Sequence, residues 1–234
     1  MIKVVELKNK AMKIKIEDGN KLLLYAFVGF IVLIVLQAVA YFGFLSAIPG
    51  FFGKYIWWIF YLDVSVVTLG VALMYYASYK GYVSCMASMM LGMTVGMQTG
   101  MMLGAVLGAT NGFFVGAMVG MILGVITGYI TGKGSLMGVL QGVMSGLMGG
   151  TMGAMITVMM FTDHILIFMP FYMIINIGIL IGFVFMYHDE VIKDQKDVIK
   201  KNIDIVTFLS MCVIATAILM VIMIYGPKSA LFSF

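Results

Sequence analysis

The chain has 234 residues, of which 63% are hydrophobic and only 10% are charged, with a mean hydropathy of +1.11. Soluble domains are about 45–50% apolar, so this composition indicates an integral membrane protein whose main partner is the lipid bilayer. The length accommodates six or seven spans of about 20 residues but no additional soluble domain. All 14 basic residues are lysines. They belong to the predicted loops, which excludes a nucleic-acid-binding face.

Seven apolar segments predict an all-α, polytopic bundle of about seven transmembrane helices. In chain order they cover roughly residues 22–48, 56–79, 82–108, 113–131, 135–160, 165–187 and 204–226. They make one transmembrane domain over residues 22–226, with a cytoplasmic segment 1–21 before it and an external tail 227–234 after it. The third and fourth segments are separated only by a predicted turn over Ala109–Gly112.

The lysines orient this bundle. With the N-terminus inside, all lysines except Lys54 and Lys228 fall on the cytoplasmic side. This asymmetry follows the positive-inside rule and predicts a cytoplasmic N-terminus with an external C-terminus. We expect the plasma membrane of a prokaryote.

The second segment contains Asp63, which is the one carboxylate clearly inside a span. Acids within the membrane are costly and often functional, so Asp63 is a candidate for binding a cation or a proton. Alternatively, it is a structural residue near the interface whose hydrogen bonds come from Tyr61, Ser65 or Thr68.

Glycine recurs at every fourth position in the three central segments. The series comprises Gly92, Gly96, Gly100, Gly104 and Gly108, then Gly112, Gly116, Gly120, Gly124, Gly128 and Gly132, then Gly138, Gly142, Gly146 and Gly150. Small residues at this spacing allow helix backbones to approach closely in lipid. The pattern predicts a glycine-zipper core of three helices within a Gly/Met-rich region over residues 82–160.

Most of the chain's 25 methionines lie in the same region. Two helical faces contain a methionine ladder, formed by Met86, Met90, Met93, Met97 and Met101 and by Met144, Met148, Met152, Met155 and Met159. An offset of 51 residues superposes much of one ladder on the other, which indicates a parallel internal repeat. Gln98 and Gln141 lie on the same two helices and either line a pore or bridge helices.

Thioethers are soft ligands that suit monovalent ions such as Cu(I). Several weak sites in a row allow an ion to step across the membrane, so the two ladders are candidate metal sites with Cu(I) as the bound ion. The competing interpretation is that flexible methionine fills the space left by glycine.

The combination of Met86-x-x-x-Met90 and Met97-x-x-x-Met101 with an adjacent Gly-x-x-x-Gly run resembles CTR-type copper transporters. The resemblance is confined to this site, because that family has three helices. It implies thioether rings within a symmetric oligomer, with glycines allowing tight packing.

Residues at the ladder ends are candidate gates. Asp163 and His164 follow the second ladder on the outside, whereas Cys85 precedes the first on the inside, where it would pass Cu(I) to a cytosolic copper carrier. A solvated turn at Asp163 and an inert Cys85 are the alternatives.

The sequence therefore predicts a non-enzymatic membrane protein that transports or handles a soft monovalent metal ion. Two other functions stay open. One is a glycine-packed channel or carrier for a non-metal substrate. The other is an accessory structural subunit that packs against a partner membrane protein.

The lysine distribution makes the topology testable. Cysteines introduced at Lys196 and Lys228 should react with a membrane-impermeant maleimide from opposite sides of the membrane. Labelling of both positions from the same side would contradict the arrangement of seven spans.

Overall fold

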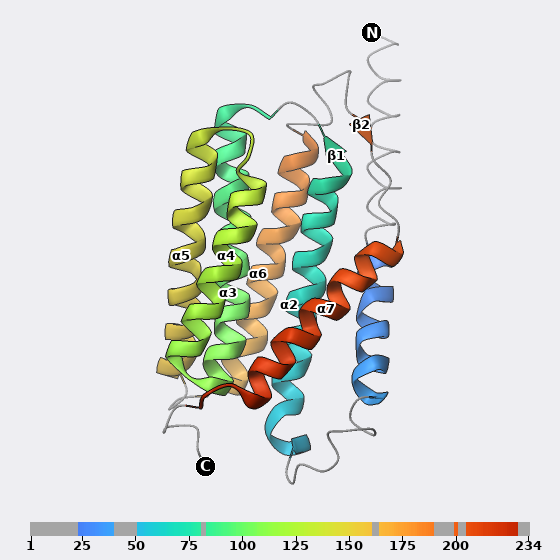
Figure 1. Cartoon of the computed structure of the whole chain (residues 1–234), viewed down its shortest axis with the longest axis vertical. Coiled ribbons are helices and arrows are strands. Elements are labelled where there is room, and N and C mark those ends of the chain that lie inside the picture. Colours follow the sequence, from blue (N-terminus) through green and yellow to red (C-terminus); the bar gives the residue numbers. More distant parts are fainter. Residues whose placement is uncertain are drawn as a thin grey trace.

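The computed structural model describes residues 23–39, 51–80, 83–160, 164–189, 199–200 and 205–228. Seven helices make up nearly all of this described part (Figure 1). They are Leu23–Val39, α2 (Phe51–Ser78), α3 (Cys85–Asn111), α4 (Phe113–Thr131), α5 (Leu136–Met159), α6 (Ile165–Tyr187) and α7 (Ile205–Tyr225). Two-residue strands β1 (Tyr79–Lys80) and β2 (Ile199–Lys200) pair antiparallel.

Six of the described helices, α2 to α7, are long and apolar enough to cross a membrane, which confirms an integral membrane bundle. The helix Leu23–Val39 is apolar but shorter. The predicted span 22–48 continues past it, into residues outside the described part. The predicted turn over Ala109–Gly112 is wrong in extent, because α3 continues to Asn111. Gly112 alone connects it to α4, with a φ of 102° that favours glycine.

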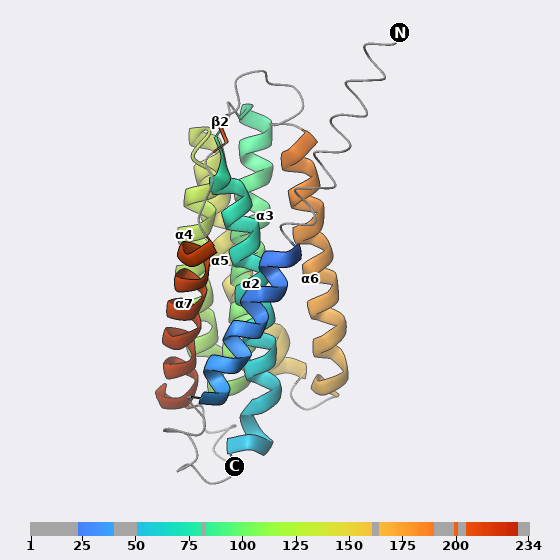
Figure 2. The ribbon, with the colours of Figure 1, turned by 90° about the vertical axis from the view of Figure 1, so that its right-hand side faces the viewer.

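The helices form two groups, and α3 belongs to the first group but also contacts helices of the second. Figure 1 shows α3, α4 and α5 together on one side, and Figure 2 shows the helix Leu23–Val39 beside α2 on the other. Consecutive helices alternate in direction, so α3 and α5 run parallel (Figure 1). α3 also contacts α2, α6 and α7.

The group of α3, α4 and α5 is packed through glycine, as the sequence predicted. A Cβ atom added to Gly120 of α4 would lie 2.9 Å from the Cα of Gly104 and 3.0 Å from the Cα of Gly150. One added to Gly124 would lie 2.8 Å from the carbonyl oxygen of Gly146. These are distances to backbone atoms, which cannot move aside as a flexible side chain can. The three helices therefore make contact backbone to backbone, and only glycine fits at the contact points.

The opposite face of α3 belongs to the hydrophobic core. Leu91, Val95, Met102 and Ala105 are almost fully buried there and pack with α2, α6 and α7. Gln98 shares this face by its spacing, since it lies three residues after Val95 and four before Met102. α3 is thus covered on both sides and fixes the positions of the other helices.

The glycine contacts predict that alanine substitutions at different glycines have very different effects on stability. Gly146→Ala should lower the free energy of unfolding by about 1–3 kcal/mol, because even a methyl group meets the α4 backbone. Gly182→Ala in α6 should leave stability unchanged or raise it, since nothing lies within 4 Å of its added Cβ. Thermal unfolding in one detergent measures both. Equal destabilisation by the two substitutions would refute the glycine-packed core.

Candidate functional site

The methionine ladders lie on the outside of the glycine-packed group. Eight of their members are exposed on the chain's surface, from 43% for Met93 to 75% for Met86, and Met97 and Met101 are partly buried. On α5, Met144 and Met148 each precede an interface glycine by two residues, which is roughly 200° around the helix. The α5 ladder therefore points away from α4.

The two ladders nevertheless occupy matching levels. A Cβ on Gly149 of α5 would lie 3.0 Å from the Cα of Met97, and one on Gly153 would lie 2.8 Å from the Cα of Met101. Met148 and Met152 immediately precede these glycines. Thioethers from both helices thus flank the α3–α5 contact at successive heights, about 6 Å apart. We call Met93, Met97, Met101, Met144, Met148 and Met152 the methionine seam.

Both helices begin in the same way. Ser84 accepts a hydrogen bond from the backbone nitrogen of Ala87 at 3.2 Å, and Ser135 accepts one from that of Gly138 at 2.9 Å. Ser84 and Ser135 are separated by the 51 residues that relate the two ladders. These caps start two parallel helices in the same register, so the predicted repeat is also present in their structure.

The space between α3 and α5 is not lined by sulfur. Glycine backbones fill it, and no ion could pass along that contact. Gly149 and Gly153, which lie outside the predicted series of glycines, make the contact to the α3 ladder. Their signal was present in the sequence as small residues next to Met148 and Met152. A chain of sites along the seam must therefore run on the outer face of the pair.

Gln141 bridges the two helices at the seam. Its Nε2 donates to the sulfur of Met93 at 3.6 Å. This bond realises the bridging role that the sequence left open for Gln141. Gln98 has a different position, because it is buried on the core face of α3 and its Oε1 has no partner in the described part of the chain.

The predicted gate residues are only partly described. Cys85 is a free, exposed thiol at the start of α3, and the exposed His164 precedes α6. Asp163 lies outside the described residues. Among the described residues, no group of three or more His, Cys, Asp or Glu side chains is placed to hold a metal ion.

Asp63 has a partner that the sequence did not suggest. Its side chain is 1% exposed, and Gln37 of the helix Leu23–Val39 donates to Oδ1 at 2.5 Å. Ser65 and Thr68 instead donate to the backbone carbonyls of Tyr61 and Val64, at 2.7 Å each. The expected hydrogen bonds from Ser65 and Thr68 are therefore not formed. Gln37 was missed because nothing in the sequence indicates which two helices pack at this level.

The Gln37–Asp63 pair joins the helix Leu23–Val39 to α2. Close by, Gly29 faces Phe208 and Val67, and Phe30 packs edge-on against Phe60 at 5.7 Å between ring centroids. These contacts hold the first described helix against α2 and α7. A charged carboxyl group is costly in this buried position, because its described partner is neutral.

Comparison of the chain with known protein families, with functionally described proteins and with solved structures found no match in any of the three. The function must therefore be inferred from the site itself.

The Gln37–Asp63 hydrogen bond predicts non-additive mutational effects. Gln37→Leu should lower the free energy of unfolding by about 1–3 kcal/mol, because it leaves a buried carboxyl group without its partner. Asp63→Leu in the same chain should restore part of that loss. A double-mutant cycle from thermal or denaturant unfolding measures the coupling. Strictly additive effects would show that the two side chains do not interact.

Proposed function

We propose that the protein binds and moves a soft monovalent metal ion, Cu(I), along the methionine seam. The observation that supports this most directly is the matched height of the α3 and α5 ladders. At each level one thioether from each helix flanks the same backbone contact, as Met97 and Met148 do. Two thioethers meet the low coordination number and soft-ligand preference of Cu(I).

A row of similar sites supports transport rather than storage. Successive levels are about 6 Å apart, so the three matched levels of the seam cover about 12 Å. Met86 and Met90 continue it at one end on α3, and Met155 and Met159 continue it at the other end on α5. Neutral thioethers bind the ion without a formal charge of their own, so each site is weak enough to release it. Conduction requires several sites of this kind.

A cation bound at the seam must be shielded from lipid on the side that faces away from α3 and α5. Hydrocarbon does not solvate charge, and ionic groups within membranes face protein or water. We therefore propose that a second copy of the chain packs on this face, so that ions lie between the seams of two chains. This resembles the thioether rings of the CTR-type transporters in site chemistry. Cys85, exposed at the inner end of α3, would pass the ion to a cytosolic carrier.

A second candidate function rests on Asp63. A carboxyl group that is 1% exposed and hydrogen-bonded to Gln37 supports a carrier that binds a proton or a hard cation between α2 and the helix Leu23–Val39. In that case the methionines are packing residues facing lipid. The accessory-subunit alternative rests on the exposed apolar faces of α4, with Met118 and Ile122, and of α5, with Leu147 and Met148, which would contact another membrane protein.

Exchange of thioether for hydrocarbon separates these functions. The double variant Met97→Leu with Met148→Leu keeps side-chain volume, so stability should change by less than about 1.5 kcal/mol. Binding of Cu(I) or Ag(I) to purified protein under reducing conditions should fall by about tenfold or more. Flux of the same ions into reconstituted vesicles should fall with it, whereas Na⁺ and K⁺ leak should not change.

The matched control is Met118→Leu with Met211→Leu. Both methionines are exposed, on α4 and α7, and both lie outside the seam. This control should bind and conduct Ag(I) like the natural chain. Absence of Ag(I) and Cu(I) binding in the natural chain, or equal loss in both double variants, would reject the metal function. Proton or cation flux abolished by Asp63→Asn but not by the seam variant would favour the second candidate.

A further inference from the structure

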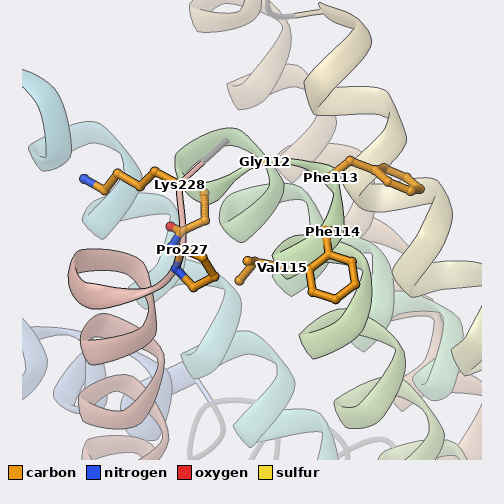
Figure 3. A pocket seen from close by; sticks show the side chains of 7 residues that line it. Gly112, Phe113, Phe114, Val115, Pro227 and Lys228 are labelled. Carbon is orange, nitrogen blue, oxygen red and sulfur yellow. The ribbon is translucent and has the colours of Figure 1, made fainter. Parts of the chain in front are cut away.

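A pocket of about 390 Å³ lies where the ends of α3, α4 and α7 meet. It is separate from the methionine seam and is shown in Figure 3. Asn111, the first turn of α4 and the residues Pro227 and Lys228 that follow α7 line it. The lysine distribution assigns this end of the bundle to the outer side of the membrane.

The α4 N-terminus faces this pocket without a side-chain cap. Gly112 is the N-cap residue, and no side chain accepts from the first turn. The first hydrogen bond within α4 runs from Gly116 N to Gly112 O at 3.2 Å. The N–H groups of Phe113, Phe114 and Val115 therefore have no acceptor within the helix. Such groups, together with the helix dipole, favour a negatively charged oxygen.

Asn111 provides an independent indication of a ligand. The residue is 2% exposed, and its Nδ2 donates to the Ile222 carbonyl at 2.9 Å, which ties α3 to α7. Its Oδ1 is buried and has no hydrogen-bond partner in the described part of the chain. A buried acceptor of this kind is costly unless a donor reaches it. Because Asn111 lines the pocket, a ligand with both an anionic oxygen and an O–H or N–H group would satisfy this acceptor once the side chain turns Oδ1 toward it.

The charge and the apolar surface around the pocket indicate which class of ligand it binds. Lys228 is the charged residue of the lining, and its ammonium lies 4.7 Å from the centroid of the Tyr55 ring, where it also donates to the Tyr55 hydroxyl. Its long stem allows the charge to turn toward the pocket. Phe113 and Phe114 project from the other side of the pocket, 47% and 71% exposed (Figure 3). Exposed phenylalanine rings in a membrane protein contact the hydrocarbon of lipid, because they have no polar group.

We propose that this pocket binds the headgroup of an anionic phospholipid that has a hydrogen-bond donor, such as phosphatidylglycerol. The phosphate lies at the α4 N-terminus near Lys228, and a headgroup hydroxyl donates to Asn111 Oδ1. The acyl chains descend past Phe113 and Phe114. A bound lipid would then join the ends of α3, α4 and α7 on the outer side.

Two matched pairs of variants test the phosphate site. Lys228→Gln is compared with Lys133→Gln, because Lys133 at the other end of α4 also lies over a tyrosine ring, 5.3 Å from the centroid of Tyr129. Phe113→Glu is compared with Phe113→Gln, which loses the same ring but adds no charge. A glutamate at the first helical position favours the helix while it competes with phosphate, so the variant should fold.

The full chain is delipidated in detergent and titrated with phosphatidylglycerol by native mass spectrometry. We expect Lys228→Gln to bind about fivefold more weakly than Lys133→Gln, and Phe113→Glu about tenfold more weakly than Phe113→Gln. Phosphatidylethanol has the same charge but no headgroup hydroxyl, and should bind the natural chain about fivefold more weakly than phosphatidylglycerol.

Equal affinity within either pair of variants would overturn the phosphate site. Equal affinity for the two lipids would overturn the assignment of a donor to Asn111. Inorganic phosphate tests whether the ligand is a soluble anion and not a lipid. If millimolar phosphate without lipid raises the unfolding temperature as much as phosphatidylglycerol does, the ligand is a soluble anion and the lipid assignment is wrong.

Discussion

Backbone contact between glycines in α3, α4 and α5 is the constraint on which the rest of the structure depends. In lipid, apolar side chains gain little by leaving hydrocarbon for another apolar surface, so close packing must hold the helices together. Here the absence of side chains at positions such as Gly104, Gly120 and Gly150 brings three backbones into contact. α3 gains a second set of neighbours on its other face, and it thereby connects the glycine-packed group to α2, α6 and α7.

The same constraint determines where the sulfur is. A helix contact made of glycine has no room for methionine, so the ladder residues are placed beside it or opposite to it. On both α3 and α5 they flank the contact between these two helices, and on α5 they lie on the side away from α4. In the function that we propose, the metal path therefore lies on the outer surface of the chain, where a second copy would enclose it. Asp63, on the opposite side of α3, is independent of that path and is held by Gln37.

Sequence reasoning recovered features that repeat along the chain. Glycine spacing predicted the three-helix core, and apolar segments predicted helix positions to within a few residues over most of the described part. It could not predict pairings between distant helices. The bond between Gln37 and Asp63 depends on which helices pack together, and the end of α3 depends on the positive φ of a single glycine. The ladders were identified as faces of two helices, but their outward placement follows from the glycine contact and appears only in three dimensions.

The central claim is that thioethers of the seam form the metal site, and X-ray absorption at the copper edge tests it most directly. The full chain is loaded with Cu(I) under reducing conditions in detergent and the ligand shell of the metal is determined. We expect a shell of two or three sulfur atoms that changes when Met97 and Met148 are both replaced by leucine. A shell of nitrogen or oxygen atoms, or a sulfur shell that the replacement leaves unchanged, would contradict it.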